Sequence, residues 1–169
     1  MNKILWRVSD GKFKTEYIRA NSLDEAKEIF KVREVLEGLI AREATKNITK
    51  EQLTRLEDTL ELMSRAAQDN RKQDAILYGS EFHHYLYEPS RIQTAVQFLT
   101  QINSRLERYR RLGGYKNPEY LPMLPVSEHQ EIFQAIKSGN AQLAEKVMRT
   151  HISRSLIDTI KTLEKIEML

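Results

Sequence analysis

The sequence has no cysteine, a single tryptophan, and only four prolines and six glycines among its 169 residues. Without cysteine, the chain can form neither a disulfide nor a thiolate metal site. Its apolar runs are short, and none approaches the roughly 18 apolar residues that a membrane-spanning helix needs. The N-terminus also lacks the apolar segment of a signal peptide. We therefore expect a soluble cytoplasmic protein with no membrane partner.

Neither sign of charge dominates. The chain carries 27 basic and 24 acidic residues, a formal net charge of +3, which is too weak to indicate a nucleic-acid partner. One basic cluster lies at 105–111, at the expected C-terminal end of a helix, where the helix dipole favours cations. We interpret this cluster as a solvated helix end. With 40% hydrophobic residues, the length predicts one domain with its own core.

The first twenty residues differ from the rest. Ile4, Trp6 and Val8 alternate with polar residues, and the turn signal Ser-Asp-Gly follows at 9–11. Alternation on both sides of such a turn is typical of a β-hairpin, because Asp-Gly tolerates the positive φ angles of a tight turn. The sequence therefore predicts a hairpin over residues 1–20.

Residues 21–169 carry helical patterns throughout. Capping boxes predict two helix starts, one at Ser22 with Glu25 and one at Thr49 with Gln52. The expected helices span residues 22–46, 49–67, 74–88, 92–112, 127–138 and 140–169, with Ser127 and Asn140 as the last two N-caps and Gly139 as a left-handed stop. A proline-rich connection remains at 113–126. The expected fold is all-α, an antiparallel bundle of six to seven helices.

Three of the four histidines lie within apolar helical stripes. His83 follows Ile76 and Gly79, while His129 and His151 belong to the stripes of two later helices. Residues spaced by three, four and seven share one helix face, so all three imidazoles should point into the same interior. His84 lies about 100° around the helix from His83 and is expected at the surface.

Two explanations fit three interior histidines. They could bind a divalent ion such as zinc, nickel or manganese, leaving coordination positions open for water or a ligand. Alternatively, each could be a core histidine bonded to a backbone carbonyl. Periodicity alone does not choose between them, because it does not give ring-to-ring distances across helices.

Two further polar residues interrupt the stripes. Arg33 lies in the first expected helix with Glu37 one turn later, so it either pairs with Glu37 or meets a bound anion. Asn103 lies beside Ile102 and Leu106, either as a half-buried amide or as a ligand contact.

Three stretches together resemble a known family: VREVLEGLIAREA, EFHHYL and SEHQEIFQAIKSGNAQLAEKVMRTHI. In this order they resemble the C-terminal effector-sensing (FCD) domain of GntR transcription regulators of the FadR subfamily. The resemblance covers about residues 23–155. It implies a dimeric helical bundle around a pocket for small carboxylates, often with a metal held by one Asp and three histidines. It places those histidines at His83, His129 and His151, and Arg33 near the pocket wall.

The chain departs from the family pattern in two ways. The metal-binding Asp of the family stands four residues before the first histidine, where this chain has Gly79. We therefore expect a weakened metal site, with Gly79 leaving room for a ligand group. The second departure is that no winged helix-turn-helix is evident, so residues 1–20 represent at most a remnant of its wing and DNA would be bound only through a domain not evident here.

The functional prediction is an effector-sensing domain over residues 21–169. It would bind a small organic acid at Arg33, Asn103 and Gly79, assisted by a metal at the three histidines, and act as a homodimer rather than as an enzyme. Two alternatives remain open at this stage. One is a metal-dependent hydrolase that uses the three-histidine site. The other is a dimerisation or interaction module without a DNA-binding domain.

Overall fold

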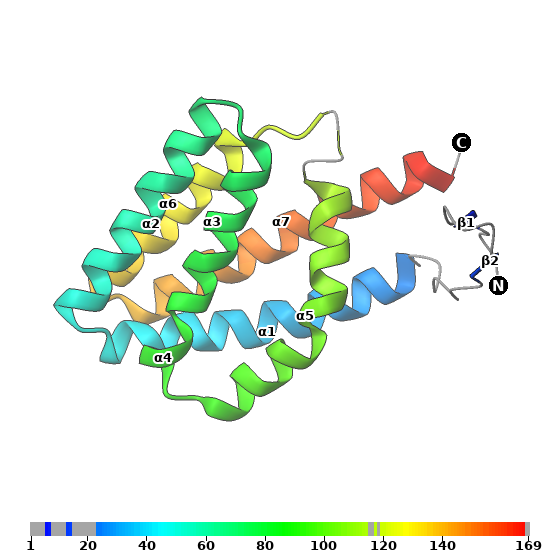
Figure 1. The fold of residues 1–169 in the computed structure, drawn as a ribbon. Coiled ribbons are helices and arrows are strands. Elements are labelled where there is room, and N and C mark those ends of the chain that lie inside the picture. Colours follow the sequence, from blue (N-terminus) through cyan, green and yellow to red (C-terminus); the bar gives the residue numbers. More distant parts are fainter. Residues whose placement is uncertain (1–5, 8–12, 15–22, 115–116, 118, 168–169) are drawn as a thin grey trace.

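The computed structural model describes residues 6–7, 13–14, 23–114, 117 and 119–167 (Figure 1). Within this part the chain is mainly helical, as the sequence predicts, and it includes two short strands. The helices are α1 (Leu23–Asn47), α2 (Lys50–Gln68), α3 (Lys72–Tyr85), α4 (Tyr87–Ser90), α5 (Gln93–Gly113), α6 (Met123–Lys137) and α7 (Ala141–Glu167).

The two strands are β1 (Trp6–Arg7) and β2 (Phe13–Lys14). They pair antiparallel, with Trp6 opposite Lys14 and Arg7 opposite Phe13. The remainder of the expected hairpin, including its turn, lies outside the described residues. The hairpin as a whole therefore stays a prediction.

Several helix ends form where the sequence predicts them. Thr49 and Gln52 complete a capping box at the start of α2. Asn140 Oδ1 accepts a hydrogen bond from the Leu143 amide over 3.0 Å at the start of α7, directly after Gly139 at φ +72°. The proposed cap of α1, Ser22, lies outside the described residues.

The predicted start of α6 is wrong. The helix begins at Met123 rather than after Ser127, and the Ser127 hydroxyl donates to the Leu124 carbonyl over 2.8 Å inside the helix. Pro125 is the third residue of α6, where a missing amide hydrogen costs nothing because the first turn has no intrahelical acceptor for it. The connection before α6 is correspondingly shorter than expected.

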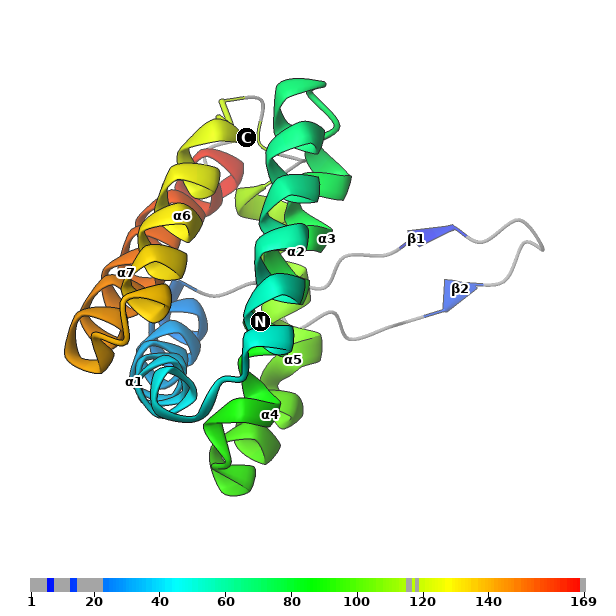
Figure 2. The same cartoon turned by 90° about the vertical axis from the view of Figure 1, so that its left-hand side faces the viewer.

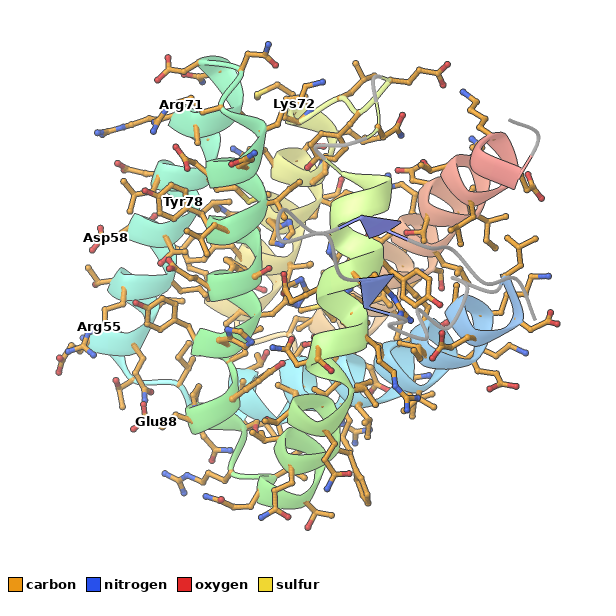
Figure 3. The ribbon with its side chains drawn as sticks, turned by 45° about the vertical axis from the view of Figure 1, so that its right-hand side comes forward. Arg55, Asp58, Arg71, Lys72, Tyr78 and Glu88 are labelled. Atoms are coloured by element: carbon orange, nitrogen blue, oxygen red, sulfur yellow. The ribbon has the colours of Figure 1, made fainter. Side chains whose placement is uncertain are left out.

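The helices form a bundle in which α1 and α7 lie side by side, and α2, α3 and α6 stand together across them (Figures 1 and 2). The helix α5 packs against both α7 and α1. Charged side chains such as Arg55 and Asp58 of α2 point outward, away from the other helices (Figure 3). None of the helices in the described part of the chain is long and apolar enough to cross a membrane.

Candidate metal and effector site

The three predicted histidines meet in the interior of the bundle. His83 comes from α3, His129 from α6 and His151 from α7, and their exposed fractions are 2%, 2% and 6%. Each offers one ring nitrogen to a group whose atoms all lie within 4.8 Å of one another. The rings of His83 and His151 are stacked with centroids 5.3 Å apart, and those of His129 and His151 meet edge to face at 4.5 Å. The stripes thus correctly predicted that these side chains share one interior.

A hydrogen-bond acceptor holds the Nδ1 atom of each ring. His129 Nδ1 lies 2.7 Å from the Pro125 carbonyl, and His151 Nδ1 lies 2.8 Å from a Glu128 carboxylate oxygen. His83 Nδ1 lies 3.3 Å from a Glu37 carboxylate oxygen. Carbonyl and carboxylate oxygens only accept, so Nδ1 is the donor in each ring. The nitrogen with a lone pair to offer is then Nε2.

His129 shows this arrangement most clearly. Its Nε2 atom is buried and has no hydrogen-bond partner among the described residues. Burial, together with the neighbouring His83, lowers the pKa of His129 to about 3, while the backbones of Pro125 and Gly79 act in the opposite direction. The ring is therefore a neutral imidazole at physiological pH, the form that binds metal ions.

Arg33 and Glu37 of α1 form the next layer around His83. Arg33 Nε lies 3.4 Å from Glu37 Oε1, and Arg33 Nη2 lies 3.4 Å from His83 Nε2. Both residues are almost completely buried. Arg33 thus makes the internal pair that was one of the two alternatives left open by the sequence, and it also reaches the histidine cluster. Because a guanidinium only donates, its contact with His83 Nε2 agrees with a lone pair on that atom.

A second polar network joins α6 to α7 behind His151. Glu128 Oε2 accepts from His151 Nδ1 and, at 2.6 Å, from Arg154 Nη2, while Arg154 Nε donates to Glu128 Oε1. Arg154 Nη1 also donates to Asp158 over 2.5 Å. Two carboxylates therefore compensate the charge of Arg154. Sequence reasoning missed Glu128, Arg154 and Asp158.

The histidines form part of the wall of a cavity of about 100 Å³. Its other lining residues come from α1, α2, α3, α5, α6, α7 and the connection before α6: Phe30, Arg33, Met63, Ala75, Ile76, Gly79, Ser80, Tyr109, Gly114, Tyr120, Pro125, Arg154, Ser155, Asp158 and Thr159. The predicted residues Arg33 and Gly79 are among them. Asn103 is half-buried on α5 and does not line this cavity, so its predicted ligand contact rests on sequence alone.

Gly79 of α3 lies beside the cluster, four residues before His83. A Cβ atom at this position would lie 3.2 Å from Met63 Cε and 3.6 Å from His129 Nε2. A side chain added here would therefore project between Met63 and the nitrogen that lacks a partner. The absence of a side chain keeps this space beside His129 open.

Tyr109 was also missed, because it lies within the basic cluster interpreted as solvated. Its ring is fully buried, lines the cavity and meets Phe30 edge to face. Its hydroxyl donates to Glu25 over 2.9 Å, and Arg108 Nη2 donates to the same oxygen over 3.0 Å. Burial and the Glu25 carboxylate raise the pKa of Tyr109 to about 12. This end of α5 is therefore docked onto the first turn of α1.

The donor set suits a divalent metal ion. It offers three imidazoles from three helices, and two of them are oriented by buried or half-buried carboxylates, as is usual for metal-binding histidines. A bound ion would supply concentrated positive charge and open coordination positions for an anionic ligand.

Comparison with known proteins supports the family resemblance found in the sequence. The model of the FCD domain matches residues 28–154. The HTH-type transcriptional repressor RspR of Escherichia coli K12 is 23% identical over 137 residues, which cover 80% of this chain and 59% of RspR. The chain thus spans 59% of the length of that relative, and 22% of an HTH-type regulator from Streptomyces ambofaciens.

Two solved structures show the same fold. Escherichia coli McbR/YncC has a TM-score of 0.76 at 16% identity, covering 93% of this chain and 77% of that one. The metal-free FCD domain of TM0439 has a TM-score of 0.69 at 18% identity, covering 85% of this chain and 97% of that one. At these identities the likeness concerns the fold alone.

Proposed function

The chain belongs to the FCD domain family, and from that premise we propose that it senses a small organic acid for a GntR-type transcription regulator. The observation that carries this proposal is the convergence of three histidines, each oriented through Nδ1, on a cavity that Arg33 also lines. Its relatives are named as transcriptional regulators, which supports a sensing rather than a catalytic role.

We propose that His83, His129 and His151 hold one divalent ion, and that this ion takes the place of the Arg33 guanidinium at His83 Nε2. The partnerless Nε2 atom of His129 supports this assignment, because a buried polar atom without a partner carries a desolvation cost that a metal bond would remove. Glu37 and Glu128 would supply outer negative charge that offsets part of the ion's charge. The family that the sequence resembles supplies this negative charge through an Asp at the position of Gly79.

A ligand carboxylate would then occupy the space beside Gly79. This space borders His129 Nε2, and Arg33 lines the same cavity with its guanidinium. A carboxylate placed there would meet positive charge from the ion and from Arg33. Most of the remaining wall on the α1, α2 and α3 sides is apolar and would exclude water around the rest of the ligand.

Binding would act on DNA through a change in the bundle. A ligand shifts such an equilibrium only by its differential affinity for two states. We propose that the domain works as a homodimer and that, in a complete regulator, the shift repositions DNA-binding domains. The Tyr109–Glu25 bond supports this route, since it joins the cavity wall to the first turn of α1.

Elemental analysis of untagged protein, purified without chelator, tests the metal assignment first. We expect about one zinc, nickel or manganese ion per chain in the wild-type protein and loss of that ion in His151→Ala. His84→Ala is the matched control, because His84 is the exposed neighbour of His83 and should keep the ion.

Thermal unfolding with a panel of small carboxylates, with and without the ion, tests the sensing assignment. The proposal requires a rise in melting temperature that depends on Arg33. Stoichiometric metal with no response to any carboxylate would contradict the sensing role. Absence of metal from wild-type protein, with a melting temperature unmoved by added divalent ions, would contradict the metal assignment.

A further inference from the structure

The helix α7 gives the cavity a second polar wall beyond the histidines. Arg154, Ser155, Asp158 and Thr159 follow His151 at spacings of three, four, seven and eight, and all four line the cavity. Tyr120, from the connection before α6, borders the same region. This wall meets whatever part of a ligand lies away from the histidine cluster.

The charge of Arg154 is already matched. Its guanidinium donates to Glu128 and to Asp158, so two carboxylates surround one cation. Among the described residues of α7 that line this cavity, a second carboxylate on the ligand would find no further positive charge. It would instead approach Asp158, which lines the cavity with its own negative charge.

Formal charges around the cavity support the same conclusion. Arg33 and Arg154 are positive, while Glu37, Glu128 and Asp158 are negative, which gives a net charge of −1. A divalent ion bound to the three imidazoles in their neutral form would change this net charge to +1. One carboxylate then brings the cavity to neutrality, and a second would return it to −1, a charge that disfavours the diacid.

Tyr120 offers a donor suited to a neutral group. Its hydroxyl makes no hydrogen bond within the described residues, although most of the side chain is buried. Burial raises the pKa of Tyr120 to about 12, with Arg154 lowering it and Asp158 raising it further. The phenol therefore stays protonated, and Asp158 beside it is an acceptor. Such a pair can satisfy both the oxygen and the proton of a ligand hydroxyl.

We propose that Asp158 is a specificity-determining residue, which makes the cavity select singly charged carboxylates with a hydroxyl group over dicarboxylates. This inference rests on the proposed function, because it assumes a carboxylate at the histidine cluster. The Asp158 side chain is 38% exposed, so solvent screens its charge in part. We accordingly expect a discrimination of about tenfold rather than an absolute exclusion.

Matched pairs of acids test this proposal by calorimetric titration of the zinc-loaded protein. Each pair consists of an ω-hydroxy acid and the diacid of equal carbon number, from 3-hydroxypropionate and malonate to 6-hydroxycaproate and adipate. Because the pairs cover several chain lengths, the test does not depend on the length of the natural ligand. For the pair that binds best, we expect the hydroxy acid to bind about tenfold more tightly than the diacid.

Asp158→Asn should reduce that preference to less than about threefold, chiefly by tightening the diacid. Glu164→Gln is the matched control, since it removes an exposed acid of the same helix that does not line the cavity, and it should leave the preference intact. Diacids that bind as tightly as hydroxy acids, or an unchanged preference in Asp158→Asn, would overturn this inference while leaving the sensing function in place. If no acid of the series binds, both proposals fail.

Discussion

The Nδ1 atom of His83 lies 3.3 Å from a carboxylate oxygen of Glu37, and both side chains are buried between α3 and α1. The same carboxylate accepts from Arg33, so one acid serves both the guanidinium and the imidazole. A carboxylate in this position fixes the tautomer of the ring and raises its basicity as a metal ligand. Stability and site chemistry therefore depend on the same side chain.

Replacing Glu37 should be costly. We expect Glu37→Ala to lower the free energy of unfolding by about 3–5 kcal/mol, because it leaves Arg33 charged and buried without its partner. Urea denaturation measures this loss. The control is Glu57→Ala, which removes an exposed pair with Lys137 and should cost at most about 1 kcal/mol. Similar losses in the two variants would contradict the assignment of Glu37 as a required counter-charge.

Glu128 should affect metal binding more than folding. We expect Glu128→Gln to weaken zinc binding by roughly 10- to 100-fold, because the amide is a poorer acceptor for His151 Nδ1 than the carboxylate is. Competition with a fluorescent chelator measures the affinity. Glu131→Gln, an exposed acid on the same helix, provides the comparison. An affinity unchanged in Glu128→Gln would show that the Glu128–His151 bond has no role in the site.

Gly79→Asp should separate the two binding events. The new carboxylate would project beside His129 Nε2, where we expect it to tighten metal binding and to weaken carboxylate binding by occupying its place. Gly79→Ala is the matched control, because it adds the same Cβ beside Met63 without a charge. Both affinities are measured by calorimetric titration. Tighter binding of both metal and carboxylate in Gly79→Asp would contradict the proposal that Gly79 leaves room for the ligand.

The lowered pKa of His129 makes stability depend on pH. Unfolded histidine binds a proton below about pH 6.5, whereas His129 in the fold stays neutral down to about pH 3. Across that window the unfolded state binds more protons, so stability falls as pH falls. The slope from this residue should be up to about 1.36 kcal/mol per pH unit.

Denaturation of metal-free protein at a series of pH values between 4 and 7 measures this slope. His129→Asn keeps a donor for the Pro125 carbonyl but does not titrate. The slope of its unfolding free energy against pH should therefore be smaller by up to about 1.36 kcal/mol per pH unit, which corresponds to one proton. Parallel curves for the two proteins would refute the neutral assignment of His129.

The sequence predicts the histidine cluster because helical periodicity determines which side chains face inward. His83, His129 and His151 each lie in an apolar stripe, and three stripes in one bundle have one interior to share. The same reasoning applied from His151 would have found Arg154 and Asp158, at spacings of three and seven on one face. Their charge favours the opposite interpretation, because polar residues usually mark the solvent side of a helix.

Other features depend on contacts between helices that no local pattern records. Tyr109 continues the spacing of Ile102 and Leu106, but its arginine neighbours suggested solvent, and only the docking of α5 onto Glu25 buries it. The prolines before Ser127 favour a loop, so the sequence predicts a later start of α6 than the structure has. Proline at the third helical position is compatible with the first turn, where backbone amides have no intrahelical acceptor.

The buried Nε2 atom of His129 has a consequence for the robustness of the whole bundle. A buried polar atom without a partner costs about 1–3 kcal/mol, a large share of the roughly 5–15 kcal/mol that keeps a domain folded. This cost arises at the histidine cluster, which is the part of the core that we propose binds a ligand. Leucine at position 129 would remove this cost and stabilise the bundle, but it would leave no group there that could bind a ligand. The imidazole lowers the free energy of unfolding of the empty protein. An ion or ligand that binds to its Nε2 atom raises this free energy again by mass action, so the stability of the bundle responds to binding.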